Sequence, residues 1–425
     1  QVHPTPLAST TATNSSSRTS ACTRSSATTT RARWRGVTRF PTSTKTTGTN
    51  WPAEDATYRD PTTGARVRRL TGYPGADSRH PYFTEPCLYD GGRRILFSSD
   101  RTGESQVYAV DRESGLIAQL TDLPAANDDG TSNRPAISED GRVVCCWCGD
   151  RMVAVDLDTL AARTLYEKPD GYVGKIPGMR CDDGAVIVSI VENVRDRTGD
   201  DWMTEKFELG PHSQVLSIPT DGGEATVLYE DERWIGHVNP SPTRPELLTY
   251  CEEGPWGRVE NRIWVLNSDT GEQWQVRNVP GDSGVGHEYW QADGERVGYH
   301  GFETVDGERR AFAGSARYDD TDRIETEIPP GGPHSHSNSP ELLVTDGSPD
   351  IGCSLLYRLD EDTGEYEGPR LLATHDWGPD SPHPHSRVLP DDSAVVFDSN
   401  RHEGTSDAYL VEIPDFEDLP RYDPE

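Results

Sequence analysis

A three-strand pattern recurs along most of this chain and constrains its fold more than any other feature. Each copy has a short apolar run, a polar turn, a second run, an Asp or Gly turn and a third run, as in RRILFSSDRTGESQVYAVDRESGLIAQLTD at 93–122. The copies begin near Arg93, Arg142, Ala185, Glu246, Arg296, Glu341 and Ser393. Periods in the forties and fifties with several strands each are typical of a β-propeller. The sequence therefore predicts an all-β fold, a seven-bladed β-propeller, with a different all-β repeat as the alternative.

The segment ARVRRLTG, which contains Arg66, precedes the first copy. We expect it to pair with the last blade around Ala408 to Ile413, so that strands from the N-terminal and C-terminal ends of the domain close the ring. The composition agrees with this fold, because 40 glycines and 32 prolines in 425 residues supply many turns, and only 33% of the residues are hydrophobic.

The first fifty residues differ sharply from the rest. They contain no Asp or Glu and seven Arg or Lys, and nearly half of them are Ser or Thr. Such a segment has too little apolar surface to fold, and it lacks the apolar core of a secretory signal. We therefore expect a disordered tail at 1–50, which also resembles a mis-assigned start, and a propeller domain at 51–425.

The chain is strongly acidic, with 72 Asp and Glu against 41 Lys and Arg and a net charge of −31. Only four of the bases are lysine, and such acidic, lysine-poor surfaces suit concentrated salt, which screens self-repulsion. The pattern indicates a halophilic protein. It argues against nucleic acid as a partner, because phosphate binding requires clustered Lys and Arg. No apolar run approaches the length of a membrane helix, so we expect no membrane partner.

Eight cysteines are present, and three of them fall in RVVCCWCG at 142–149. No second cysteine pair has zinc-ligand spacing, so we interpret this run as a buried strand that uses cysteine as a small hydrophobic residue. Reduced cysteines of this kind indicate a cytoplasmic protein.

Eight of the twelve histidines lie after position 286. Several precede an apolar strand by about the same distance in successive repeats, namely His287, His334, His336, His383 and His385. Equivalent positions on neighbouring blades face one axial space, and residues i and i+2 of an extended strand, such as His383 and His385, point the same way. Three converging imidazoles suit manganese, zinc, nickel or iron. The alternative is a set of surface histidines in proline-rich turns.

Several short motifs occur in order between about Trp51 and Pro414. They are C-x-E-G-P at 251–255, R-[IM]-W at 262–264, H-E-[FY]-W at 287–290, S-N at 337–338 before D-G, and H-P-H at 383–385. Together they resemble the oligogalacturonate lyases. The resemblance implies a cytoplasmic seven-bladed propeller that acts on short galacturonides, with a manganese ion held by three histidines and a glutamine.

The resemblance also implies which residues hold the metal. The H-P-H motif supplies His383 and His385, and the histidine four residues before the S-N asparagine is His334. His336 is then an additional histidine. Asp380 stands where the family has its glutamine, and manganese accepts carboxylate oxygen, so Asp380 is the fourth candidate ligand.

Two further matches concern the reaction itself. By resemblance, His287 is the catalytic base and Arg262 flanks the scissile bond. Additional candidates for binding the substrate, together with Arg262, are His237 and His80. The chain departs from the family at Glu252, which replaces a histidine in the first motif.

These residue types suit β-elimination from a uronate. The proton alpha to the carboxylate is weakly acidic until the charge of that carboxylate is neutralised, as a metal and an arginine do. A neutral histidine removes the proton, and the glycosidic oxygen leaves the adjacent carbon. The predicted function is metal-dependent cleavage of a small acidic oligosaccharide, a short oligogalacturonide of pectin. The alternatives are the same mechanism on a rhamnogalacturonan- or ulvan-type oligosaccharide, and a non-catalytic TolB-like binding propeller.

Overall fold

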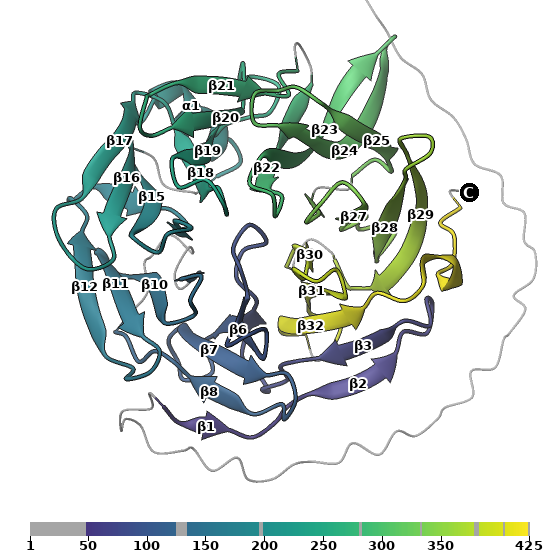
Figure 1. Cartoon of the computed structure of the whole chain (residues 1–425), viewed down its shortest axis with the longest axis horizontal. Coiled ribbons are helices and arrows are strands. Elements are labelled where there is room, and N and C mark those ends of the chain that lie inside the picture. The colour runs from purple at the N-terminus through teal and green to yellow at the C-terminus, as the bar shows by residue number, and fades with distance from the viewer. Residues whose placement is uncertain are drawn as a thin grey trace, which may run out of the picture. The chain divides into compact units, whose positions relative to one another are not determined.

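Seven antiparallel sheets surround a central axis in the unit that runs from Lys45 to Glu425 (Figure 1). The computed structural model describes residues 48–124, 134–194, 199–279, 283–331, 334–377, 382–402 and 404–423. The predicted seven-bladed propeller is therefore confirmed. Residues 1–47 of the expected tail lie outside the described residues, so the tail stays a prediction.

The first three sheets come from the N-terminal half of the chain. The first contains β1 (Asn50–Trp51), β4 (Ser78–Arg79), β5 (Leu88–Tyr89), β6 (Arg94–Ser99), β7 (Gln106–Asp111) and β8 (Ile117–Gln119). The second contains β9 (Ala136–Ile137), β10 (Val143–Cys148), β11 (Arg151–Asp156) and β12 (Ala162–Glu167). The third contains β13 (Tyr172–Gly174), β14 (Gly178–Met179), β15 (Ala185–Glu192), β16 (Ser213–Pro219) and β17 (Thr226–Asp231).

Three more sheets follow in chain order. The fourth contains β18 (Ile235–Pro240), β19 (Leu247–Glu252), β20 (Ile263–Asn267) and β21 (Gln273–Val276). The fifth contains β22 (Gly284–Trp290), β23 (Arg296–Val305), β24 (Glu308–Arg317) and β25 (Ile324–Ile328). The sixth contains β26 (Ser335–His336), β27 (Leu342–Thr345), β28 (Cys353–Asp360) and β29 (Glu365–Thr374).

The seventh sheet joins the two ends of the domain. It contains β2 (Ala56–Arg59), β3 (Arg66–Arg69), β30 (Arg387–Val388), β31 (Ala394–Ser399) and β32 (Asp407–Glu412). Val67 pairs with Val411 and Arg68 with Leu410 across β3 and β32, so the predicted ring closure is confirmed. Outside the sheets, the described chain forms α1 (Trp202–Leu209) and the short helix η1 (Phe416–Asp418). No described helix is long and apolar enough to cross a membrane.

The repeats found in the sequence correspond to the second strands of the blades. These strands are β6, β10, β15, β19, β23, β27 and β31, and each begins at, or one residue after, the start expected from the sequence. They are mostly buried, because neighbouring blades pack against both of their faces and favour continuous apolar runs. The CCWC run lies on β10, where its three cysteines are buried and form no disulfide, as predicted.

Candidate metal centre and active site

A loop between β4 and β5 fills part of the axial space and carries two aromatic residues, Tyr82 and Phe83. In Figure 1 this dark blue segment reaches the centre of the ring. Tyr82 is 6% exposed and Phe83 is fully buried. The Phe83 ring lies 5.4 Å from the ring of His334 and 6.0 Å from that of His385, between centroids. The loop therefore forms an apolar surface against which the axial histidines pack. The sequence signal is an aromatic pair in a polar segment, and our sequence reasoning missed it.

Three of the predicted ligands converge in the axial space. The ligand atoms of His334, His383 and His385 all lie within 4.8 Å of one another. They lie just before β26 and β30, the first strands of the sixth and seventh blades, which are adjacent in the ring. His336 is not part of this cluster, because its ring stacks on Tyr289 at 4.8 Å. The fourth candidate, Asp380, lies outside the described residues.

The backbone around H-P-H differs from our expectation. We expected an extended strand to direct both side chains inward, but β30 begins only at Arg387, and His385 has a positive φ of 50°. A buried carboxylate explains the conformation. The backbone N–H groups of His385 and Ser386 donate to Oδ2 and Oδ1 of Asp346, at 3.0 and 2.9 Å. The extended-strand argument was therefore wrong, although the two side chains do converge.

Asp346 also orients a histidine of the cluster. Its Oδ2 lies 3.3 Å from Nδ1 of His334, and both side chains are almost fully buried. Burial by itself raises the pKa of Asp346, but the nearby His334 and the hydrogen bonds from the backbone outweigh it and keep the pKa below its ordinary value. A carboxylate on Nδ1 leaves Nε2 as the coordinating atom, an arrangement common for metal-bound histidine. Sequence reasoning missed this residue, although it is the Asp of the quoted D-G pair.

Loss of hydration favours the neutral form of the two imidazoles that precede β30, although His383 is exposed and His385 is half-buried. It lowers the pKa of His383 and lowers that of His385 well below its ordinary value, and the neighbouring His334 adds to both effects. Neutral imidazole is the form that binds a metal. The lowered pKa values of His383 and His385 therefore favour the metal-binding form of these two side chains.

His287 stands beside the cluster on the fifth blade. It occupies a bulge in β22 between Gly286 and Tyr289, with a positive φ of 53°. Its ring centroid lies 3.9 Å from that of His334, and its Nδ1 lies 2.6 Å from Nε2 of His300. Burial lowers its pKa well below the ordinary value. The imidazole is therefore neutral, and Nε2 is the nitrogen outside this bond.

Arg262 lies at the start of β20 and points toward the same region. Its NH2 group donates to Glu253 at 2.7 Å, and its guanidinium lies 5.5 Å from the ring of Trp256. Its buried Nε has no hydrogen-bond partner among the described residues. Burial by itself raises the pKa of Glu253, but Arg262 outweighs this and lowers it to about 2. The pair is therefore charged, and the guanidinium keeps one donor for a ligand.

The two histidines suggested for substrate binding occupy different places. His237 repeats the geometry of His287 one blade earlier: it lies in a bulge of β18 with a positive φ of 36°, and its Nε2 is 3.3 Å from Glu253. His80 instead faces the seventh blade. Its backbone N–H donates to Oδ1 of Asp398 at 3.0 Å, and its ring Nε2 lies 3.4 Å from the carbonyl oxygen of Pro384. His80 thus contacts the segment between two candidate ligands.

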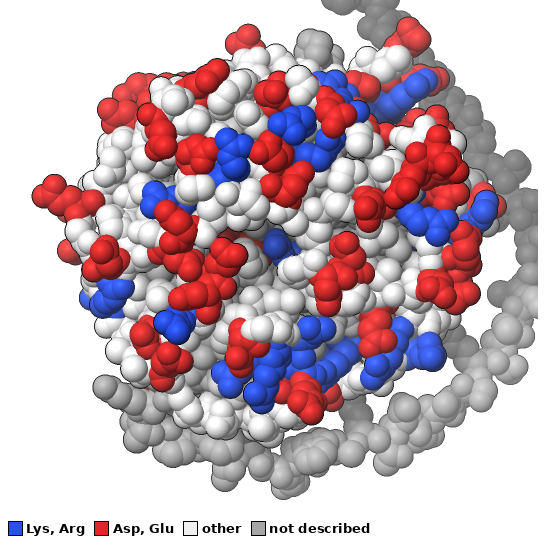
Figure 2. Space-filling view, viewed as in Figure 1, with Lys and Arg blue, Asp and Glu red and all other residues white. Residues whose placement is uncertain are grey.

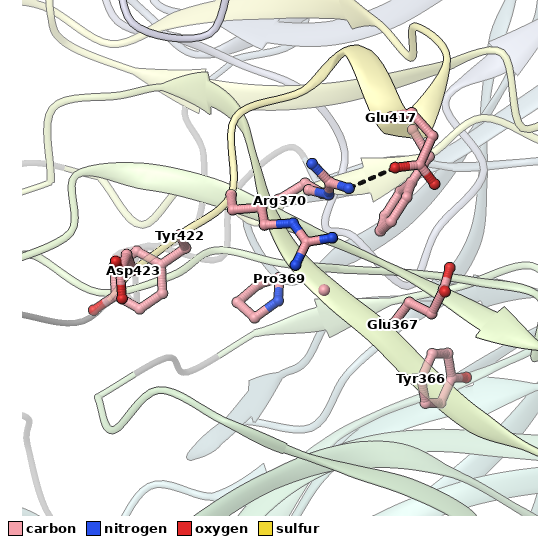
Figure 3. A pocket seen from close by; sticks show the side chains of 10 residues that line it. Tyr366, Glu367, Pro369, Arg370, Glu417, Tyr422 and Asp423 are labelled. Carbon is pink, nitrogen blue, oxygen red and sulfur yellow. Dashed lines mark hydrogen bonds and ion pairs between the residues drawn. The ribbon is translucent and has the colours of Figure 1, made fainter.

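The structure also places one departure from the family pattern. Glu252, which replaces a family histidine, pairs with Arg233 at 2.7 Å. A cavity of about 590 Å³ lies between β29 and the C-terminal segment, where Arg370 pairs with Glu417 at 2.6 Å (Figure 3). None of the predicted site residues lines that cavity. On the face drawn in Figure 2, acidic side chains surround a central hollow in which a basic group is visible.

Comparisons with known proteins agree with this geometry. A profile described as oligogalacturonate lyase matches residues 46–366. The chain belongs to the oligogalacturonate lyase family. It is 27% identical over 392 residues to an oligogalacturonate lyase of Dickeya dadantii, covering 84% of this chain and 96% of that protein. It is 26% identical over 388 residues to an oligogalacturonide lyase of Pectobacterium atrosepticum, covering 87% of this chain and 98% of that protein.

Solved structures of oligogalacturonate lyases share the fold. One, an oligogalacturonate lyase in complex with manganese, superposes with a TM-score of 0.76 at 25% identity, over 87% of this chain and 98% of the other. Another, from Vibrio parahaemolyticus, gives a TM-score of 0.75 at 22% identity, over 87% of this chain and 99% of the other. The family profile and these superpositions both cover most of the propeller.

Proposed function

We propose that this chain is a metal-dependent oligogalacturonate lyase that cleaves short galacturonides by β-elimination. The observation that carries the proposal is the position of His287. A neutral imidazole with one engaged nitrogen lies 3.9 Å, between centroids, from one of three converging histidines. A base beside a metal site is what removal of a proton alpha to a carboxylate requires.

The three histidines fit a divalent transition metal, and we propose manganese. The donor set consists of three imidazoles, two of them with a lowered pKa and the third with a carboxylate behind it. Such a second contact is common for histidine ligands. The manganese complex of a related lyase supports the same choice. When bound by His334, His383 and His385, the ion would supply positive charge that neutralises a substrate carboxylate.

The residues of this chain divide the reaction between them. Nε2 of His287 takes the proton from the carbon alpha to the carboxylate, and the electrons of that C–H bond form the new double bond. The bond from the adjacent carbon to the glycosidic oxygen breaks, and that oxygen leaves with the released sugar. Arg262 stabilises the negative charge that develops, since its Nε has no other partner among the described residues. The apolar loop that carries Tyr82 and Phe83 limits water around the histidines.

A direct assay tests the proposal. The purified protein is incubated with digalacturonate, manganese and high salt, and the ultraviolet absorbance of the unsaturated uronate is followed. Rising absorbance is the expected result. A rhamnogalacturonan disaccharide is assayed in parallel, because the alternative uronate would be cleaved in preference if the assignment of the substrate is wrong.

We further propose a cytoplasmic location and adaptation to high salt. The buried cysteines, which form no disulfide among the described residues, support the first, and the net charge of −31 supports the second.

The contacts of Asp346 give a separate prediction for the metal site. We expect Asp346→Asn to weaken manganese binding by about 10- to 100-fold, because an amide accepts through one atom only and loses either the contacts of Oδ2 with His334 and His385 or the contact of Oδ1 with the backbone of Ser386. Titration calorimetry of the metal-free protein measures the effect. Asp407→Asn is the matched control: Asp407 is equally buried but pairs with Arg69 at the ring closure. Equal metal affinity in parent and Asp346→Asn would contradict the assigned role.

A further inference from the structure

The candidate base is hydrogen-bonded to a second histidine, His300, to which the proposed function gives no role. His300 lies on β23 opposite Gly286 of β22, next to the bulge that carries His287. The two imidazole rings are nearly parallel, with 10° between their planes and 4.9 Å between their centroids. Nε2 of His300 lies 2.6 Å from Nδ1 of His287. Both atoms of this bond are imidazole nitrogens, so the proton between them can reside on either ring.

An imidazole behind the base distinguishes it from the neighbouring metal ligand. Nδ1 of His334 lies 3.3 Å from the carboxylate of Asp346. His287 instead bonds to His300, and neither of these two rings forms an ion pair with a carboxylate of the described residues. A carboxylate partner would favour the protonated form of the base before the substrate arrives. A neutral imidazole leaves the base unprotonated, and it still offers a lone pair to the Nδ1–H group of His287.

His300 also lines a cavity of about 560 Å³ on the fifth blade. The walls of this cavity include Trp256 and Phe302, and the exposed Arg309 reaches it with its guanidinium 3.5 Å from the ring centroid of Phe302. No described residue bonds the second ring nitrogen of His300, Nδ1, and this atom is not sealed from solvent. The cavity is large enough for several water molecules. Water there can accept a hydrogen bond from Nδ1–H of His300.

The stereochemistry of a galacturonide leaves the base charged after it has acted. The hydrogen alpha to the carboxylate and the glycosidic oxygen on the adjacent carbon lie on opposite faces of the sugar ring. His287, which faces the hydrogen, therefore cannot pass the proton to the leaving oxygen, which takes a proton from water instead. Until the product leaves, the added positive charge would lie beside His334, whose ring centroid is 3.9 Å away. Such a charge is unfavourable next to a site for a cation.

We propose that His300 accepts the Nδ1 proton of His287 during the elimination and so moves the positive charge from the metal site to the cavity. This inference rests on the proposed function. Nε2 of His287 gains the proton from the substrate carbon while the proton on Nδ1 passes to Nε2 of His300, whose Nδ1–H then donates to water. After the product leaves, Nε2 of His287 releases its proton to water, and the proton on Nε2 of His300 returns to Nδ1 of His287. His300 thus acts through His287 as a positioning residue.

The test removes the ring of His300 from the metal-loaded protein and supplies imidazole from the buffer. In His300→Ala, kcat per bound metal ion should fall by about 10²-fold with little change in KM, because His287 loses its proton acceptor while the substrate keeps its contacts. Added imidazole fits the enlarged cavity and should restore turnover, up to a plateau at which the cavity is filled. In a series of substituted imidazoles of similar size, the restored rate should rise with the basicity of the added ring.

Two further variants separate proton acceptance from packing. His300→Gln keeps an acceptor for Nδ1–H of His287 but cannot take up the proton, so it should remain at least about tenfold slower than the parent and gain nothing from imidazole. His212→Ala is the matched control, because it removes another hydrogen-bonded imidazole, whose Nδ1 lies 2.8 Å from the hydroxyl of Tyr172. This control should keep the parent's rate with and without imidazole.

The outcomes distinguish the inference from the proposed function. A parent that releases no unsaturated product from digalacturonate would refute the proposed function, and the inference with it. If the parent is active and His300→Ala is equally fast, the inference alone fails. It also fails if no imidazole restores the slow variant, or if the restored rate is independent of the basicity of the added imidazole, because His300 would then act only through packing.

Discussion

Replacing His287 by alanine should lower turnover by roughly 10²- to 10⁴-fold, the usual contribution of a positioned acid–base group. The variant should still bind manganese, because His287 is outside the cluster of His334, His383 and His385. Turnover is therefore measured per bound metal ion in the parent and the variant. His300→Gln is a useful companion, because His300 holds Nδ1 of His287 at 2.6 Å without occupying the axial cluster.

The competing interpretation makes His287 a packing residue. Its ring contacts His334 and lies 5.8 Å from the ring of Trp256, so its removal would then loosen the site. In that case stability and metal content would fall together, while activity per metal-loaded molecule would change little. A loss of less than tenfold after normalisation to metal would end the assignment of His287 as the base.

The pH dependence provides a second measurement on the same residue. A base acts only when unprotonated, so the rate must rise with pH through its pKa. An unperturbed histidine would place this rise near about 6.5, its ordinary pKa. Burial lowers the pKa of His287 well below that value, and the neighbouring His334 and His300 lower it further. The rate per bound metal should therefore already be on its plateau at pH 6.5 and decline only in more acidic solution. A midpoint at or above about 6.5, the ordinary value, would contradict a base with a lowered pKa.

The blades could be predicted because their information is local. Each second strand is an apolar run bounded by turns, and burial between two neighbouring blades makes such runs unavoidable. The same repeats predicted that the histidines lie together. Histidines that precede an apolar strand by a similar number of residues in successive blades occupy equivalent positions along the propeller axis. The ring closure followed from a strand-like segment left over before the first repeat, and Val67 indeed pairs with Val411.

The rest of the site could not be predicted because its contacts join distant parts of the chain. Phe83 of the first blade touches His334 and His385, which belong to the sixth and seventh blades. Asp346 binds the backbone of His385 across 39 positions. A positive φ at a histidine is also unfavourable locally, and it is adopted here because such longer-range bonds hold it. We therefore predicted the convergence of His383 and His385 correctly, but attributed it to an extended strand that the structure does not have there.

Removing any one of the three clustered histidines should abolish retention of manganese and, with it, activity. The three imidazoles come from two adjacent blades and form the whole described cluster, so each loss leaves two ligands among the described residues. Metal content is measured by elemental analysis of His334→Ala, His383→Ala and His385→Ala after dialysis. Each variant should fall to the background of the metal-free parent.

A matched control is provided by His336, two residues after His334 and equally buried. Its Nδ1 accepts a hydrogen bond from the backbone N–H of Val388 at 3.3 Å, and its ring packs on Tyr289, so His336→Ala should cost stability but keep the metal. Asp380→Gln restores the family's residue at the fourth position and should also keep it. If His383→Ala holds as much manganese as the parent, the ligand assignment fails. If His336→Ala loses the metal as completely as His383→Ala, the loss reflects general disruption of the axial packing, and coordination by the three-histidine cluster is refuted as its cause.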